Sequence, residues 1–111
     1  MIVKTFDTHT LLEDERDDVK DFASYLSHKI PRSFSKKHIL LDLLKYEKLT
    51  LEELLLFMEV STAHKETAHS FVIINNAIDP DLFPDALVVV PTIQEGEDVL
   101  GMEAIERDLG F

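Results

Sequence analysis

The sequence contains no cysteine, and only three of its 111 residues are glycine. Without cysteine the chain cannot form disulfides, use a catalytic thiol or bind zinc through thiolates. Three glycines are too few for the loops that cradle nucleotide phosphates, and neither G-x-G-x-x-G nor G-x-x-x-x-G-K occurs. These absences exclude the common phosphate-binding loops and thiol chemistry.

Long apolar runs are also missing. Apolar runs such as 71–74 and 86–90 are far too short to span a bilayer. The first residues lack the basic start and apolar core of a secretory signal peptide. A length of 111 residues with 45% apolar content is that of one small globular domain. We therefore expect a single domain over residues 1–111, located in the cytoplasm.

Basic side chains are scarce in the second part of the chain. Residues 1–48 carry nine acids and nine bases, whereas residues 49–111 carry thirteen acids and only Lys65 and Arg107. This excess accounts for the net charge of −11 and repels both nucleic-acid phosphates and anionic membranes. It suits a basic protein partner, although an acidic surface also aids solubility without any partner.

The first 43 residues predict strands and one helix. The stretch MIVKTF alternates as a strand does, and a second extended piece is predicted around residues 9–12. Apolar residues between Val19 and Ile30 then recur at helical spacing, and Pro31 is predicted to end that helix. The run HILLDL, residues 38–43, is predicted to be a short buried strand.

A second helix is predicted to begin at Leu51, after a turn over residues 44–49. Thr50 and Glu53 have the T-x-x-E spacing of a capping box, and Leu49 and Leu54 have that of a hydrophobic staple. We expect this helix to continue to about residue 66. Its predicted inner face is formed by Leu51, Leu54, Leu55 and Met58.

The rest of the chain completes an α/β pattern. SFVIINN predicts a strand buried on both faces, AIDPDLFPD a turn with room for one helical turn, and ALVVVP a last strand. A second T-x-x-E pattern opens a final helix that runs to about residue 109. Its predicted inner face comprises Val99, Met102, Ile105 and Leu109. The order indicates one α/β domain with a mixed, mostly parallel sheet of four to five strands and three main helices.

The carboxyl ends of parallel strands usually form the working surface of such a sheet. Asp42 ends one central strand there, and Asn75 and Asn76 follow another. A phosphoacceptor aspartate would also need an acidic pair after the first strand and a lysine after the last, but FDTH has one acid and VVVPT no lysine. Asp42 is therefore either a turn residue or, alternatively, a ligand-binding or phosphoryl-accepting group.

No side chains form a recognisable catalytic or metal-binding pattern. His64 and His69 are five apart, which places them on different sides of a helix and predicts a solvated helix end instead of a metal site. The serines lack a nucleophile-elbow context. We expect a non-enzymatic chain that uses no cofactor.

Two stretches, HILLDLLKYEKLTLEELLLF and AHKETAHSFVIINN, together with ALVVVPTIQEGEDVL, resemble STAS domains of the anti-sigma-factor antagonist type. The likeness covers roughly residues 1–105 and rests on the order and pattern of elements. The family carries a D-S-S-G motif at a helix start, where a partner kinase phosphorylates a serine. Aligned on LDL without gaps, that motif falls on residues 50–53, which hold no serine.

The resemblance implies a regulatory module that binds a protein, such as an anti-sigma-factor-like regulator. Glu52 and Glu53 would place fixed negative charge where the family's phosphate comes and goes, although carboxylates also stabilise a helix start without any function. The predicted partner-binding residues are Thr50, Glu52, Glu53, Asn75 and Asn76. A homodimer through an exposed strand edge at the amino terminus is a further expectation.

Overall fold

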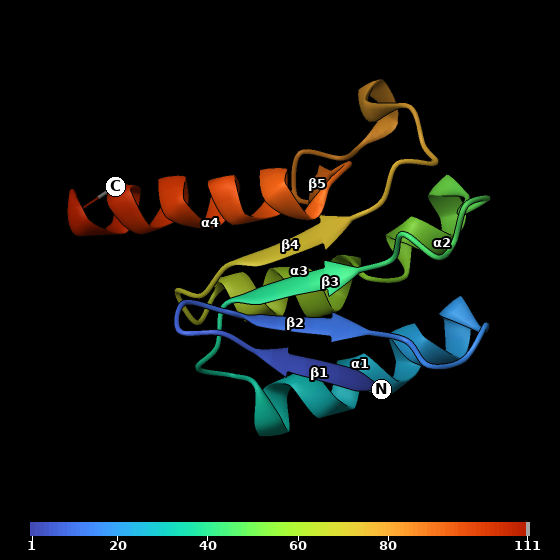
Figure 1. Cartoon of the computed structure of the whole chain (residues 1–111), viewed down its shortest axis with the longest axis horizontal. Helices are drawn as coiled ribbons and strands as arrows, with labels where there is room; N and C mark the ends of the chain where they lie inside the picture. Colours follow the sequence, from blue (N-terminus) through green and yellow to red (C-terminus); the bar gives the residue numbers. More distant parts are fainter. Residues whose placement is uncertain (111) are drawn as a thin grey trace.

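The computed structural model describes residues 1–110 and contains a five-stranded sheet with helices on both faces (Figure 1). The strands lie in the order β1-β2-β3-β4-β5; β1 is antiparallel to β2 and the other pairs are parallel. This arrangement confirms the predicted α/β class. In chain order the elements are β1 (Ile2–Thr5), β2 (Thr10–Glu13), α1 (Val19–Ser33), β3 (Ile39–Asp42), α2 (Leu51–Leu55), α3 (Met58–Lys65), β4 (Phe71–Ile74), the short 3-10 helix η1 (Pro80–Leu82), β5 (Val88–Val90) and α4 (Ile93–Asp108).

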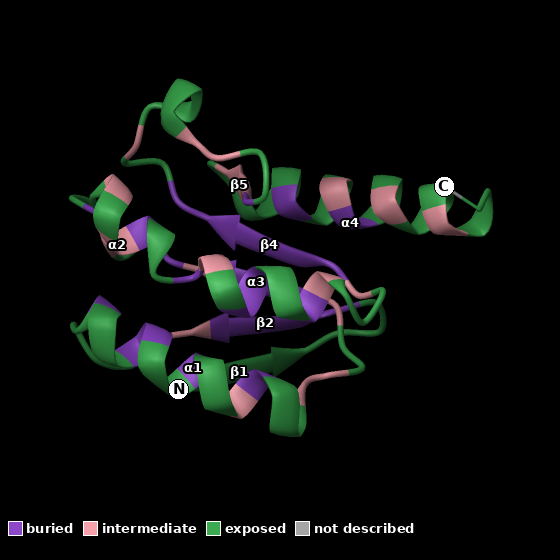
Figure 2. Ribbon diagram, turned by 180° about the vertical axis from the view of Figure 1, so that it is seen from behind, coloured by how far each residue is buried: buried purple, intermediate pink, exposed green. Residues whose placement is uncertain are grey.

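The helices divide between the two faces of the sheet because strand side chains alternate. Leu41 and Ile73 lie in the core that α1, α2 and α3 cover, whereas Leu40 and Val72 lie in the smaller core under α4. Figures 1 and 2 show these helices on opposite sides of the sheet. Every residue of β4 is buried, as predicted from its apolar run. Within residues 1–110, no helix combines the length and apolar content needed to cross a bilayer.

Helix α1 begins as predicted but does not end at Pro31. Asp18 caps its first turn by accepting a hydrogen bond from the Asp21 N–H at 3.0 Å. The helix continues to Ser33, and the Phe34 N–H still donates to the Ile30 carbonyl at 2.9 Å. Because Pro31 lies in the last turn, the helix forfeits a single backbone hydrogen bond there. Its buried inner face outweighs that cost.

The helix predicted over residues 51–66 is two helices, α2 and α3. At their junction the Leu56 N–H donates to the Glu53 carbonyl at 3.2 Å and the Phe57 N–H to the Leu54 carbonyl at 3.1 Å, which are tighter 3-10 bonds. This tightening brings Phe57 into the core, where it is fully buried. Leu55 is consequently 40% exposed, so its predicted place on the inner face is wrong.

Of the four residues predicted for the inner face of α4, Val99 packs against the smaller core as expected, but the other three do not. Gly96 and Leu100 are the buried residues of this helix, whereas Met102, Ile105 and Leu109 are 61%, 60% and 66% exposed. A Cβ atom at Gly96 would lie 3.2 Å from the Leu40 Cδ2 atom, so the glycine lets the helix approach the sheet closely. Close contact at Gly96 fixes the rotation of α4 about its axis, so that Met102, Ile105 and Leu109 point away from the sheet.

Candidate functional site

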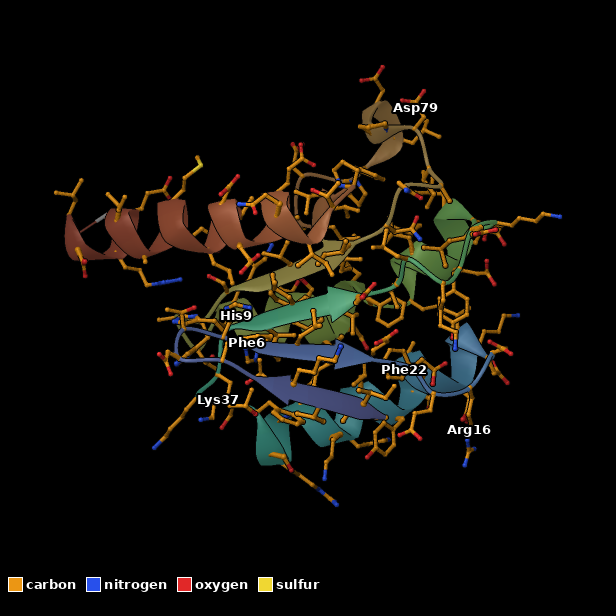
Figure 3. All side chains as sticks on the ribbon, in the orientation of Figure 1. Phe6, His9, Arg16, Phe22, Lys37 and Asp79 are labelled. Carbon is orange, nitrogen blue, oxygen red and sulfur yellow. The ribbon has the colours of Figure 1, made fainter. Side chains whose placement is uncertain are left out.

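The parallel strands β2, β3 and β4 end together at one end of the molecule, which we call the carboxyl-end surface. Glu13, Asp42 and Ile74 are neighbours in register there, and the segments 43–50 and 75–79 follow the strands β3 and β4. In Figure 3, Arg16 and Asp79 lie at this end, whereas Phe6, His9 and Lys37 lie at the opposite end. The predicted partner-binding residues all belong to the carboxyl-end surface.

The start of α2 has the predicted capping box. The Thr50 N–H donates to the Glu53 Oε1 atom at 3.0 Å, and the Glu53 N–H donates to the Thr50 Oγ1 atom at 3.2 Å. Leu49 and Leu54, the predicted staple, are both buried in the same core. The Thr50 hydroxyl and the Glu53 carboxylate are thus occupied by the helix start, whereas Glu52 is exposed.

Two consecutive asparagines after β4 have different roles. Asn75 is buried, and its Nδ2 group donates to the carbonyls of Leu43 at 2.9 Å and Tyr46 at 3.1 Å. Its Oδ1 atom accepts from the Ala77 N–H at 2.9 Å. Asn75 therefore joins the two loops from within, and of the two predicted contact residues Asn76 is the exposed one.

Asp42 lies beside a carboxylate that the sequence reasoning missed. Its Oδ1 atom accepts from the Leu44 N–H at 3.0 Å, which is the turn role predicted as one alternative. Glu13 occupies the neighbouring position of β2, on the same face of the sheet. It was missed because the predicted extended segment ended at residue 12. Among residues 1–110, no group of three or more His, Asp or Glu side chains could hold a metal ion.

A second missed feature connects the loops after β2 and β3. The Tyr46 hydroxyl donates to the buried carboxylate of Asp14, whose Oδ1 atom also accepts from the Arg16 N–H at 3.0 Å. Burial and this hydrogen bond raise the pKa of Tyr46 above its usual range. The Lys45 ammonium group donates to the Asp14 carbonyl at 3.1 Å and lies 3.1 Å from an Asp17 carboxylate oxygen. Since 31 or more residues separate Lys45 and Tyr46 from Asp14, no local pattern in the sequence indicates this contact.

Three apolar side chains at the carboxyl-end surface face solvent. Leu55 and Leu56, in and after α2, are 40% and 44% exposed, and Leu82 in η1 is 55% exposed. The two segments that carry them, 49–64 and 76–87, contain six acids and no lysine or arginine. Exposed apolar side chains among acidic residues are typical of a protein-binding surface.

The amino ends of the strands hold a histidine cluster formed by His38, His64 and His69. The ring centroids of His38 and His69 lie 5.0 Å apart, and those of His64 and His69 lie 6.0 Å apart. The predicted solvated helix end is wrong, because His64 is only 3% exposed. The chain turns back after α3 through Ala68, whose φ of 64° is left-handed, and this turn brings His69 beside His64.

Hydrogen bonds give the histidine cluster a structural role. The Ser70 N–H donates to the His38 Nδ1 atom at 3.0 Å, and His64 Nε2 donates to the Lys37 carbonyl at 2.6 Å. Burial lowers the pKa of both His38 and His64, and the nearby Arg107 charge lowers that of His38 further. His38 and His64 therefore tie together the segments that precede β3 and β4.

No protein-family model matches the chain, and a search of curated proteins finds no match either.

Proposed function

We propose that the chain is a non-enzymatic regulatory module of STAS-like type that binds a protein partner at the carboxyl-end surface. Thr50, Glu52, Glu53 and Asn76 would contribute its polar contacts. The observation that carries the proposal is the pair of exposed apolar side chains Leu55 and Leu56 beside the acids Glu52 and Glu53 at the start of α2. The resemblance in element order, and the α/β sheet that follows it, also support this proposal.

The start of α2 supports binding of the partner that is not regulated by phosphorylation at this position. In the family that the sequence resembles, a serine at this position accepts phosphate. Here Thr50 is engaged in the capping box, and Glu52 and Glu53 supply permanent negative charge beside the positive end of a helix. The partner we propose has a basic face, because such a face complements this charge and accelerates association.

The experiment is affinity co-purification of the tagged protein from its own cells at native expression, followed by mass spectrometry. Glu52→Lys is the test variant, since Glu53 is needed for the cap. Glu66→Lys, an exposed acid just after α3, is the control with the same change of charge. We expect a basic regulator that co-purifies with the wild type and with Glu66→Lys but not with Glu52→Lys. Equal retention by both variants, or equal loss, would contradict the proposed surface.

A second candidate function is phosphoryl acceptance or small-ligand binding at Asp42. The observation that favours it is the Glu13 carboxylate at the neighbouring register position. In the test reaction an Asp42 carboxylate oxygen would attack the phosphorus of acetyl phosphate with Mg²⁺ present, and acetate would leave with the bonding electrons. Mass spectrometry of the intact protein should then show one added phosphoryl group. No adduct, or an adduct that persists in Asp42→Asn, counts against this candidate.

Self-association through β1 is a separate proposal that light scattering tests. All four residues of β1 are exposed, and it is an edge strand of the sheet. A free edge can pair with the same edge of a second copy. A mass of one chain across a range of concentrations would dismiss this pairing.

A further inference from the structure

The outward side of α4 carries an apolar line that the fold leaves uncovered. Met102, Ile105 and Leu109 are spaced by three and four residues, so they lie along one side of the helix. Each is at least 60% exposed, and they lie roughly opposite the buried Gly96 and Leu100. Figure 1 shows the second half of α4 extending past the amino ends of the strands, and Figure 2 shows it mostly exposed. We call these three residues the α4 ridge.

The charged residues that α4 itself presents on or beside the α4 ridge are acids. Asp98, Glu106 and Asp108 are exposed on the same helix, on or beside its outward side. Arg107 is the only base in α4, and its guanidinium donates to the Ser70 Oγ atom at 2.6 Å, toward the sheet. The outward surface therefore combines an apolar line with negative charge that no base on this helix offsets.

We propose that the α4 ridge is a docking surface for a basic amphipathic helix of a partner protein. Apolar residues at i, i+3 and i+7 match the spacing by which paired helices bury a shared seam. A partner with lysine or arginine beside its own apolar stripe would place those cations against Asp98, Glu106 and Asp108. Charge decides against other occupants: a second copy docked ridge to ridge would bring carboxylates onto carboxylates, and an anionic membrane would be repelled. The α4 ridge is separate from the carboxyl-end surface, so neither proposal depends on the other.

The test uses a helical peptide built only from leucine and lysine at amphipathic spacing, with a leucine and glutamate peptide of the same spacing as its control. Fluorescence anisotropy measures peptide binding to the full chain. The ridge variant is Met102→Ser/Ile105→Ser/Leu109→Ser. The matched variant, Leu55→Ser/Leu56→Ser/Leu82→Ser, removes three exposed apolar side chains at the carboxyl-end surface instead. Circular dichroism confirms that each variant is folded, and Ile105→Ser alone replaces the triple variant if that one is not.

We expect the wild type and the matched variant to bind the leucine and lysine peptide but not the leucine and glutamate peptide. The ridge variant should bind the lysine peptide on the order of tenfold more weakly or worse, because the central contacts of an interface carry most of its affinity. Three outcomes would overturn the proposal: no binding by the wild type, equal loss in both triple variants, or loss confined to the matched variant. The last would leave the function proposed for the carboxyl-end surface standing. The proposal would also be overturned if analytical ultracentrifugation showed a dimer for the wild type and a monomer for the ridge variant, because a second copy would then cover the ridge.

Discussion

Replacing Asn75 by alanine should destabilise the fold far more than replacing its neighbour Asn76. The Asn75 side chain makes three hydrogen bonds, to the carbonyls of Leu43 and Tyr46 and from the N–H of Ala77. Each such bond contributes about 1 kcal/mol net, and a buried group left without a partner costs about 1–3 kcal/mol. We therefore expect Asn75→Ala to lower the free energy of unfolding by about 3 kcal/mol. Asn76 is exposed, so Asn76→Ala should change it by less than about 0.5 kcal/mol.

Equilibrium unfolding in urea, followed by circular dichroism, measures both variants. A loss below about 1 kcal/mol in Asn75→Ala would refute the reasoning, since it would mean that water replaces the amide at little cost. Asn75→Asp gives an independent check, because its carboxylate would face two carbonyl oxygens. That repulsion raises the pKa of the new carboxyl in the folded state. The variant should accordingly be least destabilised below about pH 4 and lose stability as the pH rises above the ordinary aspartate pKa of about 3.9.

Three further predictions concern the core, the helices and the dependence on pH. Gly101→Ala should raise the free energy of unfolding by about 0.5–1 kcal/mol in urea titrations, because alanine favours the helix and nothing lies within 4 Å of the added Cβ atom. Gly96→Val should lower the free energy of unfolding, because its side chain would collide with Leu40. Phe57→Ala should cost about 3–5 kcal/mol and Leu55→Ala less than about 0.5 kcal/mol, and similar losses would contradict the assigned helix break. The folded-state pKa of His38 is lowered, chiefly by burial, so its contribution to stability should be complete above about pH 6.5 and decline as the pH falls below that value. Thermal unfolding between pH 5 and 8 checks this, and His38→Gln should weaken the pH dependence to the part that His64 contributes.

Features that depend on neighbours in sequence could be predicted from the sequence. The T-x-x-E box at Thr50 and Glu53 involves residues three apart, and the structure shows both of its hydrogen bonds. The buried run of β4 carries its own signal, because a strand covered on both faces has apolar residues at every position. The α/β class follows from the order of such local signals along the chain.

Features set by packing could not be predicted in this way. The rotation of α4 depends on Gly96 meeting Leu40, a contact between residues 56 positions apart, and apolar spacing alone favoured the opposite side. The break between α2 and α3 depends on the packing of the Phe57 ring in the core, which the tighter turn at Leu56 and Phe57 makes possible. At the candidate site, Asn75 was predicted to contact a partner because the sequence does not show that the loop after β3 packs against its side chain. Glu13 was missed because its role depends on the strand beside it.

The order of strands in the sheet repeats the order of strands in the chain. A chain that emerges from the ribosome from its amino end could thus assemble this sheet one strand at a time, beginning with the β1-β2 hairpin, whose pairing is the most local. At every stage the newest strand would supply the edge on which the next one pairs. The last strand to pair is β5, which has only three residues. Such a short edge strand exposes few backbone N–H and C=O groups to which another chain can hydrogen-bond. The topology thus suits the direction of synthesis, and it leaves β1 and β5 as the two edge strands of the finished sheet.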